Sequence, residues 1–108
     1  MKRTIFGLVF MITFSANAQK GIKALINAER SFASFTVANG IKNGFLQFLD
    51  SSGVVFPGSS APNGITFHSK AQASPAVLNW APEYAVVSAS GDFGFTTGPY
   101  HLKRSPQD

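Results

Sequence analysis

Apolar residues recur at helical spacing through the part of the chain that follows the N-terminal segment. Between residues 20 and 39 they fall on one side of a helical wheel, and Gly40 then supplies the residue type that often follows a helix end. A second stripe predicts a shorter helix over residues 41–49, in which Gly44 lowers helix stability by roughly 1 kcal/mol relative to alanine. The apolar positions of the first helix are Ile22, Leu25, Ile26, Phe32, Ala33 and Val37.

Alternation with a period of two takes over in the second half of the chain. Residues 83–88 and 93–97 alternate between two faces, and residues 89–92 between them have turn composition. The pattern predicts antiparallel pairing of residues 83–88 with residues 93–102, with Asp92 capping the turn. A sheet with so many aromatic residues on one face needs cover, which we expect the rest of the chain to provide.

In the last predicted strand, the large apolar residues change from odd-numbered to even-numbered positions near the middle. Phe93 and Phe95 are odd-numbered, whereas Tyr100 and Leu102 are even-numbered, so a regular strand would point the two pairs to opposite faces. An extra residue at Gly98-Pro99, a β-bulge, would bring all four onto one face and bend the strand.

Shorter signals lie between the helices and the hairpin. They predict a turn at residues 50–53, a strand at 54–56, a loop at 57–64, one or two helical turns at 65–71 and a strand at 77–80. Helices first and strands afterwards are typical of an α+β domain.

The N-terminus has the organisation of a signal peptide. A basic start is followed by an apolar run from Ile5 to Phe14, too short to span a bilayer, and then by Ala16-Asn17-Ala18, a small-x-small cleavage site. We therefore expect a signal peptide at residues 1–18 and one domain at residues 19–108. The mature protein is expected to be periplasmic or secreted and not bound to a membrane.

Composition excludes several classes of function. The chain has nine Lys/Arg and five Asp/Glu, and because Lys2 and Arg3 belong to the leader, the net charge falls from +4 to +2 on cleavage. The remaining basic residues are scattered, so nucleic acid is not an expected partner. The absence of cysteine excludes disulfides, thiol catalysis and thiolate metal sites.

Four patterns, E-R-x-F, N-G-I-x-x-x-F-x-x-F-L, G-V-V-F-P and W-A-P-E-Y-A-x-V-S-A-S-G-D-F-G-F-T-T-G-P-Y, resemble the SnoaL-like branch of the nuclear transport factor 2-like superfamily. The resemblance spans residues 22–101 and is most specific from Trp80 to Tyr100. It implies a cone-like, curved antiparallel sheet packed against N-terminal helices, with an apolar pocket at the wide end.

Two departures from the family pattern modify this expectation. In the family, two or three further strands normally follow the one that ends near Leu102, so the resemblance implies an incomplete sheet. We expect such a chain to be marginally stable alone and to form a homodimer, aggregate or borrow a strand. The ketosteroid-isomerase relatives carry a carboxylate base near the end of the first strand, where this chain has Phe56, Pro57 and Gly58. Ketosteroid isomerisation is therefore not expected.

Three titratable residues are candidates for chemistry. Glu29 falls within the apolar stripe of the first helix, where a raised pKa would suit a general base, unless it lies at the rim or pairs with a nearby cation. His101 could face a pocket as a base, whereas His68 is expected on a surface turn. Neither histidine has the neighbours of a metal site, and no metal or cofactor is expected.

Aromatic residues suggest a pocket for a small apolar or aromatic ligand, although each also suits an ordinary core. The first hypothesis is therefore an exported ligand-binding domain without an assigned reaction. The alternatives are an isomerase, hydrolase or dehydratase with Glu29 or His101 as base, and a structural module that completes its sheet with a second chain. The candidate pocket residues are Phe32, Phe56, Trp80, Tyr84, Phe95 and Tyr100.

Overall fold

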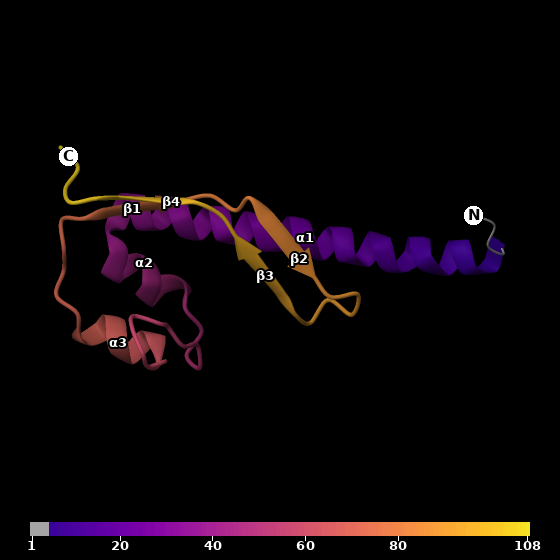
Figure 1. The fold of residues 1–108 in the computed structure, drawn as a ribbon, viewed down its shortest axis with the longest axis horizontal. Coiled ribbons are helices and arrows are strands. Elements are labelled where there is room, and N and C mark those ends of the chain that lie inside the picture. The colour runs from indigo at the N-terminus through magenta and orange to yellow at the C-terminus, as the bar shows by residue number, and fades with distance from the viewer. Residues whose placement is uncertain (1–4) are drawn as a thin grey trace. The chain divides into compact units, whose positions relative to one another are not determined.

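The computed structural model describes residues 5–108, with side chains from Lys20 onward (Figure 1). The strands of this part of the chain form two two-stranded antiparallel sheets, β1–β4 and β2–β3. The α+β class is confirmed, whereas cone-like curvature is not, since the strands pair in two separate sheets. The elements are α1 (Ile5–Asn39), α2 (Ile41–Phe48), α3 (Gly64–Lys70), β1 (Val77–Trp80), β2 (Tyr84–Val87), β3 (Gly94–Thr97) and β4 (Tyr100–Lys103).

The predicted signal peptide is described in part, since the backbone of residues 5–18 belongs to α1. Residues 1–4 and the side chains up to residue 19 are not described, so cleavage after Ala18 stays a prediction. No helix in the described part of the chain is both long enough and apolar enough to cross a membrane.

The chain divides into two units. One, called here the hairpin unit, comprises Met1–Glu29 and Pro82–Pro99, and the other, the helical unit, comprises Arg30–Ala81 and Tyr100–Asp108.

In the hairpin unit, β2 and β3 pair from Tyr84↔Thr97 to Val87↔Gly94. One face of this ladder lies on α1, because a Cβ built on Gly21 would come within 2.9 Å of the Val87 side chain. Tyr84 lies on the opposite face with Phe95, their ring centroids 6.3 Å apart. The alternation predicted from the sequence therefore separates a helix-facing side from an outer side.

The turn of this hairpin is held by its own side chains. Gly91 has a φ of 79°, a backbone conformation that strongly favours glycine. Asp92 Oδ1 accepts hydrogen bonds from the hydroxyls of Ser88 and Ser90, at 3.1 and 2.5 Å. These bonds, with that from Ser90 the stronger influence, hold the pKa of Asp92 below its usual value of 3.8. Asp92 is thus a turn-stabilising residue, as predicted.

The prediction for the last strand is correct in part. The ladder does break at residues 98–99, but β4 pairs with β1, from Val77↔Lys103 to Trp80↔Tyr100, and not with β2. Three residues (81–83) separate β1 from β2, whereas two (98–99) separate β3 from β4. The extra residue therefore lies at residues 81–83, and the predicted bulge at Gly98-Pro99 is wrong in position.

In the helical unit, an aromatic cluster joins α1, α2 and β1. The Phe32 ring lies 5.0 Å from Phe45, 5.1 Å from Phe48 in a stacked arrangement, and 4.9 Å from Trp80 edge to face. Pairs of this geometry contribute about 0.5–1.5 kcal/mol each beyond the burial of their surface. The predicted helices over residues 20–39 and 41–49 are thus held together by the apolar stripes that predicted them.

The crossing of α1 and α2 is very close. Thr36 is 1% exposed, and a Cβ built on Gly44 would lie 2.0 Å from Thr36 Oγ1 and 2.9 Å from Thr36 Cα. Gly44, the weak point of α2 in the sequence, is therefore the residue that lets the two helices approach. Gly40, with a φ of 94°, makes the reversal between them.

Large apolar side chains are exposed on the strands and at Phe93, next to the start of β3. The Phe93 side chain is 69% exposed and that of Phe95 is 48% exposed. Among the described residues, Ala33 is the one apolar residue that is buried, at 4% exposure. The expectation that the rest of the chain covers this aromatic face is wrong for the described residues, because the outer side chains of β2–β3 and the aromatic side chain of β4 are exposed. The others of this kind on the strands are Tyr84, Tyr100 and Leu102.

Candidate functional site

An apolar hollow of about 480 Å³ lies in the helical unit, between α2, α3 and the segment that joins them. This is within the size range of small-molecule sites, which are typically apolar with a few polar groups. His68 is the one lining residue with a polar side chain. The lining residues are Phe45, Leu49, Val54, Val55, Phe56, Pro57, Phe67 and His68.

The joining segment is tied down at the start of α3, which fixes the wall of the hollow. Asn63 Oδ1 accepts a hydrogen bond from the Thr66 backbone N–H at 2.9 Å, as an N-cap, and its Nδ2 donates to the Ser51 carbonyl at 2.7 Å. Asn63 also forms an isolated bridge with Val54. The strand predicted at residues 54–56 is therefore reduced to this single bridge.

The other end of α3 is held by α2. Lys42 Nζ donates to the carbonyl oxygens of Ser69, at 3.2 Å, and Ala71, at 2.8 Å, which lie at the C-terminal end of α3. A cation there satisfies carbonyl groups that the helix leaves unpaired. The ammonium is thus engaged at the helix end and does not line the hollow.

His68 is buried, at 9% exposure, which contradicts its predicted place on a surface turn. Its imidazole lies 4.5 Å from the Phe45 ring and 5.1 Å from the Phe67 ring. Burial lowers the pKa of His68 below its ordinary value of 6.5, so the ring is neutral at pH 7.

The rim of the hollow is exposed and apolar. Phe56 is 76% exposed, Val54 48% and Phe67 37%. These side chains remain in water in the structure, and a ligand in the hollow would cover them. Their exposure makes the hollow open on the side formed by residues 54–57.

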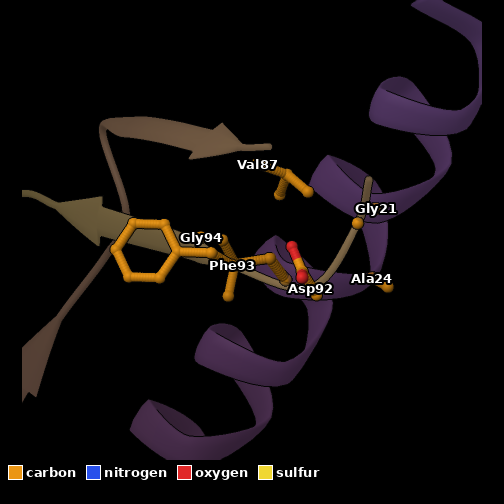
Figure 2. A pocket seen from close by; sticks show the side chains of 8 residues that line it. Gly21, Ala24, Val87, Asp92, Phe93 and Gly94 are labelled. Carbon is orange, nitrogen blue, oxygen red and sulfur yellow. The ribbon is translucent and has the colours of Figure 1, made fainter. Parts of the chain in front are cut away.

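A second hollow, of about 400 Å³, lies in the hairpin unit between α1 and the turn of β2–β3. Figure 2 shows the Val87 side chain directed toward Gly21, whereas the Phe93 ring points away from the helix. Asp92 is the one charged side chain that lines it, and its carboxylate is already occupied by the turn serines. Glycines and an exposed turn form much of the wall, so this hollow offers few fixed contacts. Its lining residues are Gly21, Ala24, Leu25, Val87, Gly91, Asp92, Phe93 and Gly94.

The two candidate bases belong to different units. Glu29 Oε1 accepts a hydrogen bond from Thr96 Oγ1 at 3.1 Å within the hairpin unit, a partner that the sequence did not reveal. His101 is exposed on β4, opposite Asn79, in the helical unit. In the described part of the chain, no group of three His, Asp or Glu side chains could hold a metal ion.

The six predicted pocket residues are distributed over both units. Phe56 lines the apolar hollow, and Phe32 and Trp80 belong to the cluster that contacts Phe45. Tyr100 is exposed on β4. Tyr84 and Phe95 lie on the outer face of the hairpin.

Of the eight residues that line the apolar hollow, Phe56 alone was among the predicted pocket residues, and His68 is the missed residue with a polar side chain. Asn63 is the signal for His68, because an N-cap there starts α3 at Gly64, and the residue one helical turn later on the same face is His68.

Comparison of the chain with protein-family models, with curated proteins and with solved structures finds no match.

Proposed function

We propose that the protein is a small-ligand-binding domain whose site is the apolar hollow, and that its ligand is a small apolar or aromatic molecule. The observation that carries the proposal is a hollow of about 480 Å³, with an apolar wall, on a frame held by the Asn63 cap and the Lys42 bonds. A site on capped elements keeps its shape without the ligand, which lowers the entropy cost of binding.

The expected affinity is modest. A bicyclic aromatic ligand that covers about 200 Å² of the rim and loses about as much of its own surface gains on the order of 10 kcal/mol from burial. Association costs at least about 4 kcal/mol of this, so dissociation constants in the micromolar range or weaker are expected.

We extend the proposal to the compartment and the family. The order of basic, apolar and small residues in positions 1–18 supports export, and the patterns between residues 22 and 101 support a SnoaL-like domain. An enzymatic role for Glu29 or His101 has less support, because Glu29 is hydrogen-bonded to Thr96 and His101 is exposed on β4.

The test uses N-phenyl-1-naphthylamine, an uncharged dye that fluoresces in apolar sites. Phe56→Ala removes the most exposed wall residue and is expected to weaken dye binding about tenfold, by loss of contact area. Phe95→Ala is the matched control, since Phe95 is also exposed but lines neither hollow, and it is expected to leave binding unchanged. Equal binding by wild type and Phe56→Ala would contradict the proposal.

One observation favours a second candidate, a module that completes its sheet with a second copy of the chain. Tyr100 and Leu102 pair with Trp80 and Leu78 and share their face, yet they are 68% and 59% exposed. Antiparallel pairing of two β4 strands centred on His101 would place each Tyr100 against a Leu102 of the other copy. Sedimentation velocity on residues 19–108 should then show a concentration-dependent dimer that Leu102→Lys abolishes, and a monomer at all concentrations would exclude this candidate.

A further inference from the structure

His68 is the one polar side chain in the wall of the apolar hollow, and it lies there without a hydrogen-bond partner among the described residues. The side chain is about nine-tenths buried, and its ring is flanked by the rings of Phe45 and Phe67. Leucine or phenylalanine would pack there without desolvating a polar group. The ring nitrogens are not among the fully buried, unpartnered polar atoms of the described residues, so part of the ring edge stays accessible to a molecule in the hollow.

The state of the ring decides what it can bind. At pH 7 the imidazole is neutral because burial lowers its pKa, so one ring nitrogen donates a hydrogen bond and the other accepts one. No lining residue carries a charge. Lys42 of α2 is bonded to the carbonyls at the end of α3.

A charged ligand is disfavoured in such a site. A carboxylate or an ammonium group would lose its hydration and find no opposite charge in the wall. A pure hydrocarbon, in contrast, would fill the hollow but leave the imidazole unpaired. Sites that hydrogen-bond a hydroxyl discriminate strongly against the analogue that lacks it.

We propose that the hollow selects uncharged hydroxylated aromatic molecules, with the ligand hydroxyl hydrogen-bonded to His68 and the ring packed between Phe56 and Phe67. The inference rests on the proposed ligand-binding function and adds the class of ligand. The hydroxyl donates to the free ring nitrogen, while the apolar body of the ligand covers the exposed rim.

The experiment compares three naphthalenes of similar size as competitors of the dye: 2-naphthol, 2-methylnaphthalene and 2-naphthoate. We expect 2-naphthol to bind about tenfold more tightly than 2-methylnaphthalene, the effect of one hydrogen bond to a group otherwise left unpaired. The anionic 2-naphthoate is expected to bind most weakly. His68→Phe should remove the preference for the hydroxyl and keep the binding of 2-methylnaphthalene.

A second measurement on the wild-type protein does not depend on the folding of a variant. Nitrogen-15 spectra of the histidine rings should show 2-naphthol shifting the His68 ring nitrogens, while those of exposed His101 stay unchanged. 2-Methylnaphthalene should produce a much smaller shift at His68.

The two proposals fail in different ways. If none of the naphthalenes displaces the dye, or if Phe56→Ala binds them all as wild type does, the ligand-binding function itself is overturned. If all bind but 2-naphthol has no advantage, or keeps its advantage in His68→Phe, or leaves the His68 nitrogens unshifted, only the inference about the hydroxyl is overturned.

Discussion

The substitution Gly44→Ala tests whether the close crossing of α1 and α2 determines the stability of the helical unit. From the sequence alone this change should stabilise the protein, because alanine is favoured over glycine in a helix interior by roughly 1 kcal/mol. The structure predicts the opposite sign. The added Cβ would lie 2.0 Å from Thr36 Oγ1, 2.7 Å from Thr36 Cβ and 2.9 Å from Thr36 Cα.

The magnitude follows from what has to move. Rotation of the Thr36 side chain relieves the contact with Oγ1, but Cβ and Cα move only if the helices separate. Separation would pull Phe32 away from Phe45, whose ring centroids lie 5.0 Å apart. Overpacking of this kind costs typically 1–3 kcal/mol and occasionally more. After the gain in helix propensity, we expect a net loss of about 1–2 kcal/mol, or roughly 5–15 °C in Tm for a domain of this size.

The assay is urea and thermal unfolding followed by circular dichroism and by the fluorescence of Trp80, the single tryptophan. Gly58→Ala is the control, since a Cβ there meets nothing within 4 Å, and it should change the free energy of unfolding little. Thr36→Ala combined with Gly44→Ala removes the nearest contact atom and should recover part of the loss. A Gly44→Ala protein as stable as wild type, or more stable, would refute the close crossing.

Three further predictions concern the frame of the site, its pH dependence and the N-terminus. Asn63→Ala should lower the free energy of unfolding by about 1–2 kcal/mol in urea, through loss of the cap on Thr66, whereas Asn63→Asp, which keeps the cap acceptor, should lose less. Because the pKa of His68 is lowered by folding, the unfolded chain binds the proton first, so stability should fall as pH drops from 6.5 toward 5. His68→Phe should flatten that slope, while the lowered pKa values of Asp50, Asp92 and Asp108 act only near and below 3.8. Intact mass of exported protein should correspond to a chain that starts at Gln19, and an uncleaved cytoplasmic chain would contradict the predicted signal peptide.

The elements that the sequence predicted well are those set by local chemistry. Gly40 ends α1 at Asn39, and α2 begins at Ile41, as the spacing of glycine and apolar residues indicated. The hairpin turn at Gly91 and Asp92 likewise depends on residues within a few positions of one another. In each case the determining contacts span a turn of helix or a turn of the chain, so a single sequence contains the information.

The features that it did not reveal depend on contacts between distant residues. A proline lies in both connections between strands, Pro82 between β1 and β2 and Pro99 between β3 and β4. The sequence does not say which connection is one residue longer. The strand registers show that it is the connection at residues 81–83. The pairing of β4 with β1, instead of β2, follows from that difference. From the sequence, Gly44 is only a residue of unfavourable helix propensity. The structure adds that it lies against Thr36, which is eight positions earlier in the sequence.

The misplacement of His68 has a related cause with a functional consequence. In a seven-residue helix the apolar periodicity is too short to set a phase, so the polar residue was assigned to the surface. Asn63 sets that phase instead, and it turns Gly64 and His68, one helical turn apart, to the buried side. Close packing explains Gly64, because a Cβ there would lie 2.5 Å from Leu49 Cδ1. Packing does not explain an imidazole at position 68, because an apolar ring there would make the same ring contacts with Phe45 and Phe67. The residue is therefore better explained by what enters the hollow than by the stability of the fold, and for that reason the hydroxyl preference and its loss in His68→Phe are the decisive measurements on this site.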